Sequence, residues 1–64
     1  MQLHNETMEI GDRIIKISQP WRKGTIIRIM TMYPNEKYYT IEWDGGSISP
    51  QSHSMIRPYL GIDN

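Results

Sequence analysis

The sequence predicts an all-β protein, a small barrel of five short strands with one short 3-10 turn before the last strand. The first observation is composition, because the 64 residues include 11 Ile and no Ala, Val or Phe, and β-branched side chains favour strands. The second is a strict alternation of apolar and polar residues over 38–43. The third is the regular recurrence of Gly, Pro and Asp between short apolar runs, which is typical of tight turns in a small barrel.

Length and composition indicate one domain. We expect residues 1–7 to form a flexible N-terminal arm, residues 8–60 the barrel and residues 61–64 a C-terminal tail. The chain has no Cys, so packing, helped by self-association, must supply its stability. No basic start with an apolar run opens the sequence and no stretch is apolar enough to span a bilayer, so we expect a cytoplasmic protein without a signal peptide.

The expected strands are separated by recognisable turn signals. They cover residues 13–17, 25–32, 38–43, 47–49 and 56–60. A turn at Gly11-Asp12 precedes the first strand, and residues 18–24 should interrupt the sheet because Pro20 cannot donate to a ladder. Gly24 suits a bulge or a tight corner.

The remaining turns follow the same logic. We expect residues 33–36 to form a hairpin loop, and Asp44-Gly45-Gly46 is the strongest turn signal because these residues tolerate positive φ. Pro50 should stop the fourth strand, and residues 51–55 fit one turn of 3-10 helix. Pro58 places the last strand at an edge.

The clearest strand is the third. Its apolar face is expected to carry Tyr39, Ile41 and Trp43. Its polar face carries Tyr38, Thr40 and Glu42. Such alternation is typical of a half-buried strand with one face on the core.

These residues together resemble a known fold family. The frame consists of Gly11-Asp12-Arg13-Ile14, Trp21, Gly24-Thr25-Ile26, Tyr38 to Gly45, and Ile56-Arg57-Pro58. It is similar to the SH3-like barrels of Tudor and KOW type and covers nearly all of the expected folded part. The resemblance implies a binding module, since KOW loops often touch RNA or another protein, and Tudor barrels hold methylated ammonium groups in an aromatic cage.

A narrower resemblance concerns an enzyme. The plasmid-borne type II dihydrofolate reductase, an SH3-like tetramer, opens with Gly-Asp-Arg followed by Lys, Ser, Trp and Gly. This chain is similar to it at Gly11-Asp12-Arg13, Lys16, Ser18, Trp21 and Gly24. In that family a Val-Gln-Ile-Tyr segment follows a Gly-Ser and lines the active pore. Here Gly46-Ser47 continues as Ile48-Ser49-Pro50-Gln51, so the resemblance implies shared architecture without reductase activity.

Two groups of residues are candidates for binding. By resemblance, Trp21 with Tyr39 or Trp43 occupies the positions of an aromatic cage, while the alternation of the third strand predicts instead that Tyr39 and Trp43 are core. The second group is a basic strip that could hold phosphates while a base stacks on Trp21. It comprises Arg13, Lys16, Arg22, Lys23 and Arg28. An ordinary solvated face is the alternative for the strip.

We expect neither a catalytic site nor a metal site. His4 and His53 lie at no ligand spacing from each other or from a pair of carboxylates. In Ser52-His53-Ser54 successive side chains of an extended chain point to opposite faces, so no nucleophile and base pair is implied. We therefore expect no enzyme, no cofactor and no metal.

The sequence thus predicts a binding or adaptor module whose groove combines Trp21, Tyr38 and the Arg22-Lys23 pair. Seven basic and seven acidic residues balance, so nucleic acid would bind through a local patch, and a protein partner remains open. A homo-oligomeric adaptor or inhibitor and a reductase-like enzyme are the alternatives. Met30, Met32 and Met55 are adaptable enough for a partner surface, and the small size and Ile bias lead us to expect a regulator from a phage or mobile element.

Overall fold

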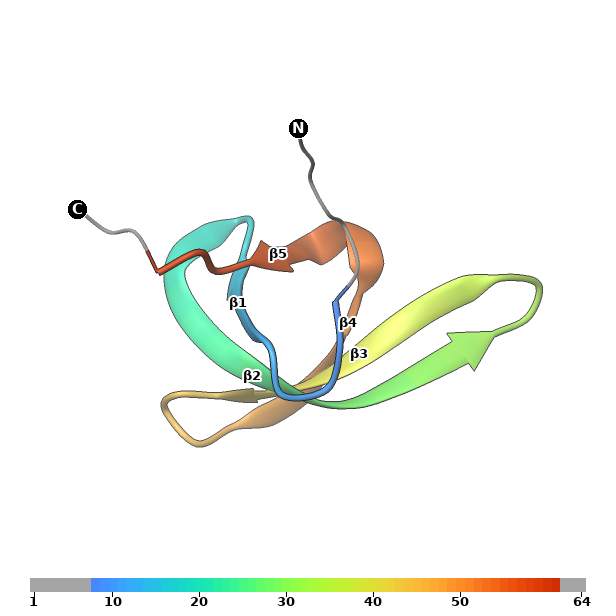
Figure 1. Ribbon diagram of the computed structural model, residues 1–64, viewed down its shortest axis with the longest axis horizontal. Helices are drawn as coiled ribbons and strands as arrows, with labels where there is room; N and C mark the ends of the chain where they lie inside the picture. Colours follow the sequence, from blue (N-terminus) through green and yellow to red (C-terminus); the bar gives the residue numbers. More distant parts are fainter. Residues whose placement is uncertain (1–7, 62–64) are drawn as a thin grey trace.

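The computed structural model describes residues 8–61, and these form one antiparallel sheet of five strands (Figure 1). The elements are β1 (Arg13–Lys16), β2 (Gln19–Met32), β3 (Glu36–Trp43), β4 (Ile48–Ser52), the 3-10 turn η1 (His53–Met55) and β5 (Ile56–Pro58). The strand order is β4-β3-β2-β1-β5. The all-β class, the five strands and the 3-10 turn before the last strand are confirmed.

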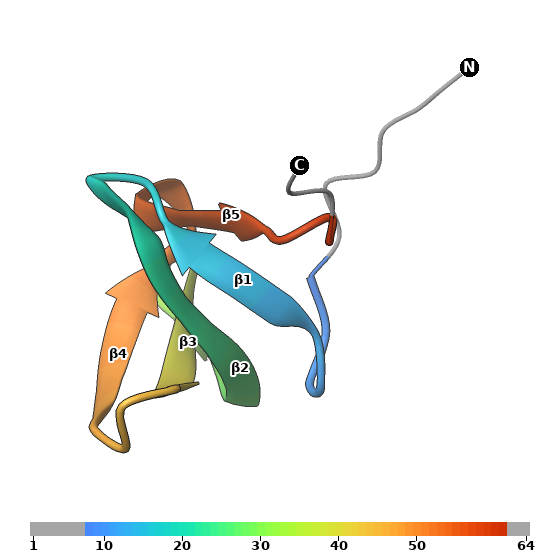
Figure 2. The same ribbon diagram turned by 90° about the vertical axis from the view of Figure 1, so that its left-hand side faces the viewer.

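The sheet is strongly coiled, so that β1 and β5 fold over the face of β2 and β3 (Figure 2). β4 and β5 are its two edges, which confirms the edge position expected from Pro58. The strand order pairs neither edge with the other, and closure into an SH3-like barrel stays a prediction. The expected arm of residues 1–7 and the tail from residue 62 lie outside the described residues.

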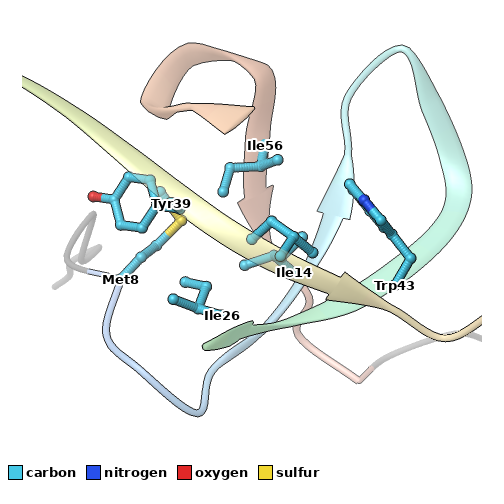
Figure 3. Packing of buried hydrophobic residues seen from close by; sticks show 7 residues of the cluster. Met8, Ile14, Ile26, Tyr39, Trp43 and Ile56 are labelled. Carbon is cyan, nitrogen blue, oxygen red and sulfur yellow. The ribbon is translucent and has the colours of Figure 1, made fainter. Parts of the chain in front are cut away.

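The core lies on the inner face of this coiled sheet (Figure 3). Its buried cluster comprises Met8, Ile14, Ile26, Tyr39, Ile41, Trp43 and Ile56. Ile14, Ile26 and Ile41 have no exposed surface at all. The alternation predicted for the third strand is confirmed, because its odd-numbered residues from 39 to 43 are buried and its even-numbered residues are not.

Two strand boundaries differ from expectation for the same reason. Residues 19–24, expected to interrupt the sheet, belong to β2, and Pro50, expected to stop the fourth strand, lies inside β4. Proline lacks a donor but leaves the extended backbone intact, so an edge strand or a bulge accommodates it. Pro50 is on the sheet's edge strand, and Pro20 is in a bulge described below.

Gly24 is required by packing against the third strand. A Cβ at this position would lie 2.5 Å from Ile41 Cγ2 and 2.9 Å from the Glu42 carbonyl oxygen. Gly11 and Gly46 serve a different purpose, since their φ angles of 97° and 108° form the two expected turns.

Candidate nucleic-acid interface

A bulge in β2 creates the most exposed aromatic surface next to the core. Gln19 pairs with Lys16 and Lys23 pairs with Ile15, so the three residues between, 20–22, have no partner in β1. Pro20 cannot donate to a ladder, and the extra residues loop out of it. Trp21, at the centre of this bulge, is 72% exposed.

A shallow groove of about 270 Å³ lies beside the bulge. Its lining residues are Trp21, Arg22 and Lys23 from β2 with Trp43, Asp44, Gly45 and Ser47 from the end of β3 and the following turn. The Asp44 amide donates to the Lys23 carbonyl oxygen at 2.9 Å, which ties the turn to β2. The structure therefore brings together Trp21, Arg22 and Lys23, as the sequence predicted, and adds the Asp44 turn.

Arg22 is held across the indole of Trp43. Its guanidinium carbon lies 4.5 Å from the ring centroid, and Nη1 donates to Gln19 Oε1 at 3.4 Å. Trp43 is fixed in turn, because its Nε1 donates to Ser49 Oγ at 2.9 Å. The cation of Arg22 is thus pre-oriented on the floor of the groove by stacking and one hydrogen bond.

Lys23 extends the positive surface toward the last strand. Its ammonium lies 5.1 Å from the Tyr59 ring centroid. Ile15 is opposite both Lys23 and Arg57 in the register, so these two cations share one face with Ile15 between them. Sequence reasoning missed Arg57, since only the pairing of β1 with β5 places it here.

Asp44, the carboxylate of the groove, is already paired. Arg13 Nη1 donates to Asp44 Oδ1 at 2.7 Å and Nη2 donates to Oδ2 at 2.6 Å, while Nη1 also donates to Thr25 Oγ1. These hydrogen bonds hold the pKa of Asp44 below its usual 3.8 and raise that of Arg13. Arg13 therefore neutralises a carboxylate in this structure and is not a free cation.

The predicted basic strip is divided by the fold. Arg13 is engaged by Asp44, and Arg28 is exposed just beyond a second bulge, at Ile27. Lys16 is half-buried opposite Gln19 and Ile56. Of the five residues, only Arg22 and Lys23 line the groove. Residues that are close in sequence along a strand point to opposite faces of the sheet and lie toward opposite ends of the strand, so they do not form one surface.

The expected grouping of Tyr38 with Trp21 is wrong. Tyr38 pairs with Met30 and Ser52, on the opposite face of β3 from Trp43 and five residues farther along. It lines a second, larger groove of about 610 Å³. That groove is bordered by Met8, Asn35, Glu36, Lys37, Tyr38, Tyr39, Ser52, His53 and Ser54.

An open cage of Trp21, Tyr39 and Trp43 is not formed. Tyr39 is 2% exposed and Trp43 3%, and the two rings lie at different ends of the core (Figure 3). One face of Trp43 is covered by Arg22. Both rings are core residues, which is the alternative that the alternation predicted.

The second groove holds a paired histidine. Tyr39 OH lies 3.3 Å from His53 Nδ1, and burial raises the pKa of the Tyr39 hydroxyl above 10.0. Ser52 Oγ and Ser54 Oγ lie 3.3 Å apart. Within residues 8–61 no hydrogen bond joins either serine to His53, so the segment forms no nucleophile and base pair there.

Within the part of the chain that the structure describes, no three His, Cys, Asp or Glu side chains gather closely enough to hold a metal ion. The same residues contain no helix with the length and hydropathy of a membrane span. No family model, no curated protein and no solved structure matches this chain.

Proposed function

We propose that this protein is a non-catalytic binding module that takes single-stranded nucleic acid at the groove beside Trp21. One observation carries the proposal. A 72% exposed indole lies on a bulge next to Arg22 and Lys23, neither of which is in an ion pair within residues 8–61. Over residues 8–61 the ion pair between Arg13 and Asp44 is the only one.

The groove offers the two contacts that a single strand requires. An unpaired base stacks on the exposed face of Trp21, and phosphates follow Lys23 and Arg57 on the same side of the sheet. Arg22 stays on Trp43 and adds a fixed positive charge below the base. A duplex has no unstacked base to offer to Trp21, so single strands are favoured.

Electrostatics make this affinity modest and dependent on salt. The chain has a net charge of +0, so attraction depends on the local patch and is screened within about 8 Å at physiological ionic strength. The pairing of Asp44 with Arg13 limits repulsion of phosphates inside the groove.

The decisive experiment is a titration of the full chain with a short dye-labelled oligothymidine, followed by the anisotropy of the dye and by tryptophan fluorescence, and repeated at several salt concentrations. Stacking on Trp21 should quench its emission, and Trp21→Ala should weaken binding by about 5- to 100-fold, as expected for one stacked base. The matched control is Tyr33→Ala, because Tyr33 is 96% exposed but lies in the loop after the far end of β2.

The salt dependence separates phosphate contacts from stacking. Lys23→Ala should lower the slope of log affinity against log salt by about 0.7, while Lys37→Ala, on β3 outside the groove, should leave the slope unchanged. Equal effects of Trp21→Ala and Tyr33→Ala, or a flat response to salt, would overturn the proposal. Recovery of a stoichiometric protein partner after nuclease treatment would assign the same surface to protein binding.

A further inference from the structure

Among residues 8–61, one edge of β2 has no backbone partner along its second half. The ladder with β1 runs from Gln19 to Thr25 and is extended by two bonds at Ile26, whose N–H donates to the Asp12 carbonyl and whose carbonyl accepts from the Gly11 amide. From Arg28 to Met32 the strand pairs with β3 on one side only, considering residues 8–61. In Figure 1 this part of β2 and β3 projects from the sheet as a two-stranded arm.

This edge lacks the protection found on the other two. β4 carries Pro50 and β5 carries Pro58, each of which removes an N–H from an edge strand. Residues 28–32 contain no proline. A free edge with intact donors is a template for another strand.

The side chains beside this edge are apolar and exposed. Met30 is 40% exposed and Met32 44%, and Tyr38 is opposite Met30 on the same face. Unbranched Met side chains adapt readily to a second surface.

We propose that the occupant is a second copy of this chain, with residues 28–32 of the two copies paired antiparallel about a twofold axis at Met30. Met30 of each copy would lie opposite Met30 of the other, and Arg28 opposite Met32 of the other. The patch is thus self-complementary, as a twofold interface requires.

The charges at the two ends of the arm support an identical partner. Glu36 is opposite Met32 within one copy, so the pairing places Arg28 of one copy in the same row as Glu36 of the other, roughly 10 Å apart between backbones. Arg and Glu side chains can span that gap over the intervening Met32. A net charge of +0 means that two copies do not repel one another.

Dimerisation and the groove at Trp21 are independent. Trp21 lies at the opposite end of β2, in the first bulge, whereas the proposed pairing begins beyond the second bulge at Ile27. A dimer would carry two open grooves, which would raise the apparent affinity for a strand long enough to reach both.

The test is the mass of the full chain in solution, by sedimentation or light scattering, from micromolar to millimolar concentration. We expect a dimer that Met30→Lys converts to a monomer, since two like charges would face each other at the axis. The matched control is Ile48→Lys, on β4, where the side chain is 57% exposed. This variant should remain dimeric.

A wild-type monomer at every concentration would overturn the proposal, and so would equal dissociation by both variants. If Met30→Lys fails to fold, amide hydrogen exchange of residues 28–32 in the wild-type protein tests whether two copies pair at this edge. Slower exchange in concentrated than in dilute protein supports the pairing, and exchange independent of concentration overturns it.

Discussion

β2 and β3 pair with each other along most of their length, yet the two halves of this hairpin are physically different. In the half near the turn at Asp44, Ile26 and Ile41 are paired and have no exposed surface. In the arm, Met30 and Met32 belong to the same ladder and are 40% and 44% exposed. Strand pairing is therefore not what buries a side chain in this protein.

The difference arises from what covers each half. β1, β5 and Met8 pack over the inner face of the first half and over Tyr39 and Ile29 just beyond it (Figures 2 and 3). Neither β1 nor β5 pairs with the arm in the described part of the chain. The bulge at Ile27 lies between the pairs formed by Ile26 and Arg28. It adds one residue to β2 and bends the strand just before the core ends at the pair formed by Ile29 and Tyr39.

The largest expected effect tests this division directly. Ile41→Ala should lower the free energy of unfolding by about 2–5 kcal/mol, because it leaves a cavity in a closed core. Met32→Ala, in the arm, should change it by less than about 1 kcal/mol. Urea denaturation of both variants, followed by fluorescence of the buried Trp43, measures the difference at low protein concentration. Equal losses would mean that the arm is packed as tightly as the core.

A smaller effect is expected where backbone and side chains approach closely. Gly24→Ala should destabilise by about 1–3 kcal/mol, because its new methyl group must displace Ile41 and the backbone of Glu42. Gly45→Ala is the control, since a Cβ there meets no atom within 4 Å. Thermal unfolding of the two variants should show a clear drop for the first and almost none for the second. A neutral Gly24→Ala would show that β3 can shift at this point.

The smallest expected change in stability concerns the ion pair between Arg13 and Asp44, at the end of the hairpin near the Asp44 turn. Arg13 lowers the pKa of Asp44 in the folded state. The ionised Asp44 therefore stabilises the fold at pH values above its unfolded-state pKa of 3.8, and this stabilisation is lost as the pH falls through its folded-state pKa. Asp44→Asn should reduce stability slightly at neutral pH and flatten its decline in acid. Urea midpoints measured over an acid series test this prediction. The control is Glu42→Gln, which removes a carboxylate that is not part of the ion pair between Arg13 and Asp44. An unchanged acid slope in Asp44→Asn would contradict it.

Local patterns predicted the parts of this protein that depend on local chemistry. The alternation from Tyr38 to Trp43 predicted which face is buried, because side chains of a strand alternate whatever its neighbours are. The turns at Gly11 and Gly46 followed from the need for positive φ. Both prolines that were expected to end strands were misread, since a proline is tolerated wherever its missing donor would face no partner.

The candidate site was predicted only in part. Trp21, Arg22 and Lys23 are consecutive, and the structure keeps them together in the groove. Tyr38 was assigned there and lies elsewhere, and Arg57 was missed, because both depend on which strands are neighbours. No periodicity within a single strand contains that information.

The sequence by itself determined the all-β class, the turns at Gly11 and Gly46 and the inward face of β3, since each follows from preferences of a few adjacent residues. Only the tertiary structure decided that Arg13 pairs with Asp44, 31 residues away, and that Arg22 stacks on Trp43. It also decided that no strand within residues 8–61 pairs with the outer edge of β2 along its second half. These outcomes depend on register and on the length of neighbouring strands. Both are selected by packing of the whole core.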